Sequence, residues 1–193
     1  MNKSKQVAVT GLFAALIILL QFMSGFLKIG AFNLSLVLIP IVLGAVLYGP
    51  KVGTILGGVF GAVVVVCCMT GLDPSGAILW AANPFLTFLT CMLKGMAAGF
   101  AAGILAKALK PVNRYFACVV AAVAAPIVNT GLFCGAMVLF FQDILRQWAG
   151  GTNVFYFTII TLVGINFLIE LAVNAIFSPA ITRIVDAVKK VKR

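Results

Sequence analysis

Long apolar stretches without a charged residue divide the chain into segments. No Lys, Arg, Asp or Glu occurs in residues 6–27, 29–50, 52–72, 74–93, 115–142 or 147–169. A helix needs roughly 20 apolar residues to cross the hydrocarbon core of a bilayer. The segments have this length repeatedly, so the pattern predicts a polytopic membrane protein. Because the apolar runs are continuous rather than alternating, they indicate helices and not a β-barrel.

Turn signals place six helices within a single integral membrane domain, residues 1–193. The Gly49-Pro50 turn divides the apolar stretch 35–71, and Gly150-Gly151 separates the last two helices. The predicted helices cover about residues 5–24, 35–49, 51–71, 81–107, 113–141 and 154–186. We therefore expect an all-α membrane protein with six transmembrane helices, the second of them tilted or partly re-entrant. A cleaved signal peptide is the alternative for the first segment, which lacks a clear small-residue cleavage site.

Composition and charge sharpen this prediction. Only 9% of the residues are charged, against about 25% in a soluble domain. Six spans put both termini on one side, which then receives Lys3, Lys5, Lys51, Lys107, Lys110, Arg114, Arg183, Lys189, Lys190, Lys192 and Arg193. The positive-inside rule predicts that this side is cytoplasmic. The basic tail is expected to contact the lipid bilayer rather than nucleic acid.

The stretch "IPIVLGAVLYGPKVG" (39–53) superficially resembles a phosphate-binding loop. Such a loop reads G-x-x-x-x-G-K-[ST] and joins a strand to a helix. Here Pro50 separates Gly49 from Lys51 and removes a backbone donor, and Val52 stands where magnesium would need a hydroxyl. We interpret the stretch as a tight cytoplasmic turn and expect no ATP site in this chain.

Small residues recur every four positions on three of the predicted helices. They are Gly53, Gly57 and Gly61; Gly95, Gly99 and Gly103; and Gly11 with Ala15, beside Thr10 with Ala14. This spacing lines one helix face and lets helix backbones approach closely. For the two glycine series we favour structural packing, which predicts a tightly packed cytoplasmic half.

Polar residues occur instead in the outer half. Asn83, Thr87, Thr90 and Lys94 share one face of the fourth helix, and Asn166, Glu170 and Asn174 are spaced by four on the last. Ionisable groups at membrane depth usually face a protein interior or a cavity. Lys94 and Glu170 form either a buried ion pair or part of a ligand site. Asn83 is either a ligand contact or a helix cap.

The candidate ligand-binding residues are accordingly Asn83, Thr87, Lys94, Asn129 and Asn166. The five cysteines lie in apolar segments and no histidine is present, so we expect neither a metal site nor a disulfide framework. Hydrolytic chemistry also lacks its usual residues, and we expect no enzyme activity.

Four stretches together resemble the S components of energy-coupling factor (ECF) transporters. They are "VAVTGLFAAL", "IPIVLGAVLYGPKVGTILGGVFG", "NPFLTFLTCMLKGMAAGFAAGI" and "PIVNTGLF", and the resemblance extends over essentially the whole chain. It implies a six-helix S-component bundle in a prokaryotic cell membrane, with a vitamin bound toward the outer side. It also implies as partners a transmembrane coupling protein and two cytoplasmic ATPases, which bind the ATP.

The family docks on its coupling protein through an A-x-x-x-A pattern on the first helix. By resemblance this chain would use Gly11 and Ala15, or Thr10 and Ala14 in the other register. Segments 36–61 and 83–103 most resemble the pantothenate branch, with riboflavin and folate as further candidates. The alternative function is a self-sufficient secondary transporter of a small polar metabolite, although no internal repeat supports it.

Overall fold

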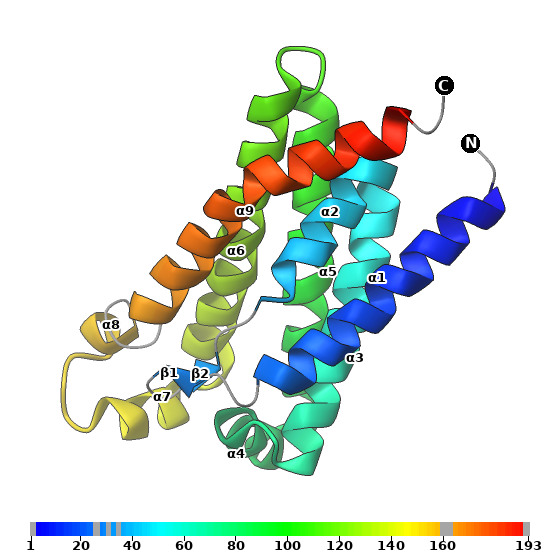
Figure 1. Ribbon diagram of the computed structural model, residues 1–193. Helices are drawn as coiled ribbons and strands as arrows, with labels where there is room; N and C mark the ends of the chain where they lie inside the picture. Colours follow the sequence, from blue (N-terminus) through cyan, green and yellow to red (C-terminus); the bar gives the residue numbers. More distant parts are fainter. Residues whose placement is uncertain (1–2, 25–27, 30–31, 34–35, 159–163, 191–193) are drawn as a thin grey trace.

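The computed structural model describes residues 3–24, 28–29, 32–33, 36–158 and 164–190, which form a bundle of helices (Figure 1). One short hairpin, in which Lys28 pairs with Asn33, follows the first helix. The elements are α1 (Lys3–Ser24), β1 (Lys28–Ile29), β2 (Phe32–Asn33), α2 (Leu38–Tyr48), α3 (Pro50–Thr70), α4 (Pro74–Ala82), α5 (Pro84–Leu109), α6 (Arg114–Phe140), α7 (Gln142–Ala149), α8 (Val154–Tyr156) and α9 (Gly164–Lys190).

Local chemistry sets most of the helix boundaries. Gly49 has a φ of 91°, and Pro50 then begins α3 at a position where its missing N–H costs nothing. Gly71 ends α3 in the left-handed conformation with a φ of 76°. The Asn113 side chain caps α6 by accepting hydrogen bonds from the backbone N–H groups of Tyr115 at 2.8 Å and Phe116 at 3.2 Å. Residues 39–53 therefore run from α2 through the turn at Gly49 into α3. A phosphate-binding loop instead joins a strand to a helix.

Four helices in the described part of the chain are long and apolar enough to cross a membrane. They are Gln6–Ser24, Pro50–Thr70, Pro84–Leu109 and Arg114–Phe140. The α2 helix is apolar but has only 11 residues, which is short for a full crossing. The expectation of six spans stays a prediction, because length and composition identify four candidate spans among the described residues.

The structure also corrects one expectation: residues 72–80, between the predicted helices 51–71 and 81–107, were expected to form a loop. Residues 74–82 form the α4 helix, which follows Asp73 and begins with Pro74. A further helix, α7, occupies residues 142–149 between the two last predicted spans. Both short helices lie at the same end of the bundle as the hairpin, whereas α1 begins and α9 ends at the opposite end (Figure 1). We call these the α4 end and the terminal end.

The glycine series predicted to pack closely do so between α3 and α5. A Cβ atom added to Gly57 would collide with the backbone carbonyl of Gly95, and one added to Gly53 would collide with that of Gly99. Gly103 lies equally close to the backbone of Pro50. The prediction of close backbone approach is confirmed for these two helices, which are in direct contact along the terminal half of the bundle.

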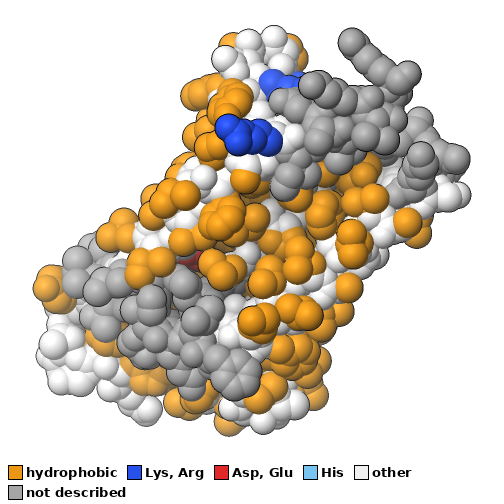
Figure 2. Space-filling model, in the orientation of Figure 1, with side chains coloured by type: hydrophobic (Ala, Val, Ile, Leu, Met, Phe, Trp, Pro, Cys, Tyr) orange, Lys and Arg blue, Asp and Glu red, His pale blue; other side chains and the backbone are white. Residues whose placement is uncertain are grey.

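The small residues Gly11 and Ala15 on α1 are not packed closely in this way. A Cβ atom on Gly11 would meet nothing within 4 Å, and Ala15 is exposed. Large apolar side chains such as Leu12 and Leu19 are also exposed on this helix. Apolar side chains cover much of the face shown in Figure 2, and the Lys and Arg side chains visible there lie toward the terminal end. This surface has the character expected for contact with lipid or with another membrane protein.

Candidate functional site

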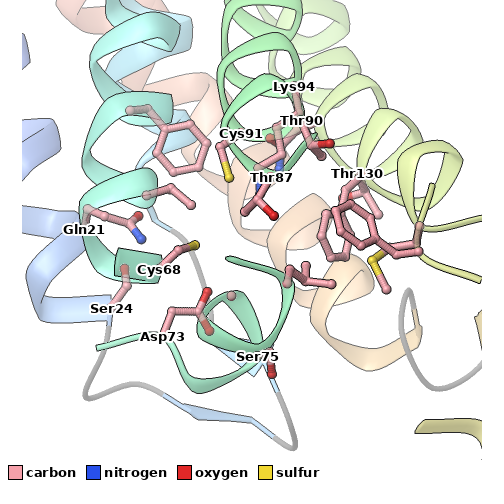
Figure 3. A pocket seen from close by; sticks show the side chains of 18 of the residues that line it. Gln21, Ser24, Cys68, Asp73, Ser75, Thr87, Thr90, Cys91, Lys94 and Thr130 are labelled. Atoms are coloured by element: carbon pink, nitrogen blue, oxygen red, sulfur yellow. The ribbon is translucent and has the colours of Figure 1, made fainter. Parts of the chain in front are cut away.

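A cavity of about 150 Å³ lies within the bundle toward the α4 end (Figure 3). Its wall is formed by α1, α3, α4, α5, α6 and α9. The lining residues are Gln21, Ser24, Phe60, Val64, Cys68, Asp73, Ser75, Gly76, Leu79, Thr87, Thr90, Cys91, Lys94, Asn129, Thr130, Phe133, Met137, Phe141, Phe167 and Glu170. A concave site of this kind, mostly apolar with a few polar groups, is typical of small-molecule binding.

Lys94 is the cation among these lining residues. Its Nζ atom lies 5.0 Å from the ring centroid of Phe133 and 5.9 Å from that of Phe60, so two phenyl rings flank the ammonium group. Such cation–π contacts stabilise a partly desolvated cation by about 0.5–2 kcal/mol. Within the described part of the chain, no salt bridge joins Lys94 to Glu170 or Asp73. The interpretation of Lys94 and Glu170 as a buried ion pair is therefore not what the structure shows.

The threonines of α5 present oxygen lone pairs to the cavity. Thr87 donates its hydroxyl proton to the carbonyl of Asn83 at 2.9 Å, and Thr90 donates to that of Leu86 at 2.7 Å. Each proton is thus used within the helix, one turn back along the chain. Both side chains are buried, at 2% and 9% exposure. What they offer a ligand is a hydrogen-bond acceptor.

The α6 and α9 helices contribute further acceptors to the wall. Asn129 on α6 is 8% exposed, and its Oδ1 atom has no hydrogen-bond partner among the described residues. Glu170 on α9 is 8% exposed and also lines the cavity. One turn further, Asn174 is fully buried and donates to the backbone carbonyl of Glu170 at 2.8 Å. A buried acceptor without a partner costs about 1–3 kcal/mol, which a ligand donor would recover.

The structure brings three of the five predicted binding residues together on the cavity wall, namely Thr87, Lys94 and Asn129. Asn83 is exposed and does not line the cavity. Its Oδ1 atom instead accepts a hydrogen bond from the backbone N–H of Leu86 at 3.0 Å and caps α5. The capping alternative is therefore the observed one. Asn166 belongs to α9, but its side chain lies outside the described residues.

Several lining residues were not among the predicted binding residues. They include the two rings around Lys94, the thiols of Cys68 and Cys91, and Asp73 from the segment expected to be a loop. Spacing could have indicated some of them, because Phe133 and Met137 follow Asn129 at intervals of four residues on α6. The same interval of four residues links Phe60, Val64 and Cys68 on α3. Asp73 carried no such signal, since it precedes α4 rather than lying within a helix.

The predicted docking residues of α1 fall on two different faces. Gly11 and Ala15 are exposed, and the space beside Gly11 is open. Ala14 is partly buried against the core of the bundle, and Thr10 donates its hydroxyl proton to the carbonyl of Gln6 at 2.8 Å. Of the two registers, the one with Gly11 and Ala15 presents small residues to the outside.

A known protein family matches nearly the whole chain. The family model for the substrate-specific component of the ECF transporter matches residues 5–182. The chain belongs to this family. As an ECF substrate-specific component it is a substrate-specific membrane subunit, and family membership implies association with an ECF module of a coupling protein and ATPases. No curated protein sequence matches the chain.

Family membership agrees with the physical character of the site. An ECF substrate-specific component needs a cavity for its ligand, and the residues that line the cavity at the α4 end all lie within residues 5–182. The matched region also includes the α1 surface around Gly11 and most of α9. The cavity, the apolar helices and the exposed α1 surface around Gly11 therefore all belong to the region that the family model matches.

Proposed function

We propose that this chain captures a water-soluble vitamin on the outer side of the membrane for ATP-driven uptake, with pantothenate as the favoured substrate. The observation that carries the proposal is Lys94, whose ammonium group faces the cavity without a salt bridge among the described residues. A carboxylate on the substrate would form the ion pair that Lys94 does not make with Asp73 or Glu170, the two acidic residues of the wall. Charge-assisted hydrogen bonds of this kind are roughly twice as strong as neutral ones.

The size of the cavity favours the smallest of the three candidate vitamins. Its volume of about 150 Å³ is below the range of about 300–1,000 Å³ that is usual for drug-sized ligands. Riboflavin and folate carry extended ring systems, whereas pantothenate is a short acyclic acid. Pantothenate is therefore the first substrate to test, and riboflavin and folate follow.

We further propose that the α4 end faces the outside and that both termini are cytoplasmic. The terminal end carries the exposed cations Lys51, Lys107, Lys110 and Arg183. The described part of the α4 end carries two cations, Lys28 of the hairpin and Arg146, together with Asp73 and Asp143. The positive-inside rule assigns the more basic end to the cytoplasm. The cavity then lies in the outer half of the bilayer, within reach of a substrate outside the cell.

The uptake assay for this proposal separates binding from transport. Cells that produce this chain together with an ECF module are expected to accumulate radiolabelled pantothenate, and the accumulation should require ATP hydrolysis by the partner ATPases. The chain alone should bind the vitamin but not concentrate it. Accumulation by the chain alone, driven by a proton or sodium gradient, would instead establish the secondary transporter.

The exposed α1 face yields a prediction about the partner. Replacing Gly11 and Ala15 by leucine is expected to abolish uptake, because small residues allow close contact between helices. Ligand binding should be unchanged, since neither residue lines the cavity. Equilibrium binding to the purified chain and uptake in cells measure the two effects. The matched control is Leu12→Ala on the same exposed helix surface, and loss of binding together with uptake would contradict docking at this face.

A further inference from the structure

Three of the hydroxyl groups of the cavity wall, those of Ser24, Thr87 and Thr90, leave acceptors rather than donors for a ligand. Thr87, Thr90 and Ser24 each donate their proton to a backbone carbonyl four residues earlier, at distances of 2.7–2.9 Å. Each hydroxyl oxygen still has lone pairs to offer. Three of the polar positions on the wall therefore favour ligands that bring their own O–H or N–H groups.

Charged and amide groups extend this pattern. Asp73 and Glu170 present carboxyl oxygens to the cavity. Gln21 and Asn129 each have a buried side-chain oxygen without a hydrogen-bond partner among the described residues. Against these acceptors stands Lys94, the cationic donor of the wall. The cavity is thus rich in acceptors and has one strongly donating position.

The strong donor and the outermost carboxylate lie at different ends of the cavity. In Figure 3, Lys94 and Thr90 are at one end, and Asp73 projects from the start of α4 at the other, near Ser24. Asp73 occupies the N-cap position of α4, yet its side chain makes no capping hydrogen bond. It is half-buried, and its carboxylate has no salt bridge with Lys94 within the described part of the chain. The Asp73 carboxylate is therefore available to a ligand.

We infer that the cavity selects monocarboxylates that carry several O–H or N–H donors, and that it binds them in one direction. The carboxylate lies at Lys94, and the donor-bearing end lies at Asp73, which is a specificity-determining residue. This inference deepens the proposed function and rests on it. Pantothenate satisfies the requirement because its carboxylate is at one end and its two hydroxyls are at the other.

The direction of binding can be tested with two ligands that differ at one end only. Panthenol has the hydroxyl end of pantothenate but a primary alcohol in place of the carboxylate. Asp73→Asn is expected to weaken binding of both ligands to the purified full-length chain by about tenfold, because a neutral acceptor replaces a charged one. Lys94→Met should weaken pantothenate binding strongly and panthenol binding little. Asp143→Asn, outside the cavity on α7, is the matched control.

Two results would overturn this arrangement. If Asp73→Asn left the affinity for both ligands unchanged, Asp73 would not contact the ligand. If it strengthened pantothenate binding and left panthenol binding unchanged, Asp73 would lie at the carboxylate end rather than the hydroxyl end, because removing its negative charge would relieve repulsion there. Melting temperatures of all variants show whether each remains folded. An unchanged melting temperature together with weaker binding of both ligands would place the effect of Asp73→Asn at the ligand rather than in the fold.

The ligand class can be tested on the wild-type chain with no substitution. Pantothenate and biotin each combine one carboxylate with O–H or N–H donors, panthenol lacks the acid, and nicotinate lacks the donors. Binding of biotin in place of pantothenate would support the ligand class while removing pantothenate from the proposed function. If panthenol or nicotinate bound as tightly as pantothenate or biotin, the proposed ligand class would be overturned. The importer function would still stand.

Discussion

Lys94→Met is expected to lower the affinity for pantothenate by about 30-fold or more. Removing one partner of a desolvated charge pair costs about 2 kcal/mol at the low end, and each 1.4 kcal/mol is about a factor of ten. Methionine has nearly the length of lysine and keeps contact with the rings of Phe60 and Phe133. Isothermal titration of the purified chain with pantothenate measures the loss.

The stability of the unliganded protein separates this effect from misfolding. Lys94 makes no salt bridge among the described residues, although Glu170 lines the same cavity, so the methionine variant should melt at a temperature close to that of the wild type. Lys107→Met is the matched control, because Lys107 is exposed near the end of the same helix. Equal loss of affinity in both variants would show that general charge, rather than a contact at Lys94, attracts the ligand.

Gly57→Ala is expected to destabilise the bundle by about 1–3 kcal/mol, or to prevent its accumulation in the membrane. The added methyl group would collide with the backbone carbonyl of Gly95, and backbone atoms cannot turn aside as a side chain does. The α3 and α5 helices would have to separate, which has the cost of an overpacked core. Denaturation of the detergent-solubilised protein, followed by circular dichroism, measures the change.

The neighbouring glycine offers a close control for this prediction. A Cβ atom on Gly58 would have the side chain of Met96 as its nearest neighbour, at 3.6 Å, which is ordinary van der Waals contact. Gly58→Ala should therefore be neutral or slightly stabilising, because alanine favours the helix over glycine by up to about 1 kcal/mol. The same loss of stability in both variants would mean that an added methyl group on α3 is harmful at either position, and that contact with the Gly95 backbone does not explain the role of Gly57.

Individual helices were largely predictable from local features of the chain. The start of α3 follows from Gly49-Pro50, and its glycine spacing predicted the close contact with α5 that the structure contains. The α4 helix was missed because the apolar and turn-forming residues of 71–80 resemble a loop. Asp73-Pro74 was the available signal, since proline is common in the first turn of a helix.

The candidate site was predictable only in part, because helical spacing alone does not show which residues face another helix. Helical spacing placed Thr87 and Lys94 on one face of α5, and both line the cavity. The same spacing included Asn83, but this residue lies at the cap of the helix and its side chain turns to the backbone of Leu86. Periodicity identifies residues that share a face. It does not identify which of them lie opposite another helix.

The sequence by itself determined that this chain is a set of apolar helices with small residues on the faces of α3 and α5, because segment length, charge and spacing are properties of the chain alone. Only the tertiary structure decided that α4 contributes a wall of the cavity, that Lys94 lies between Phe60 and Phe133, and that Gly11 faces outward. These features depend on which atoms of distant segments come within a few ångströms of each other.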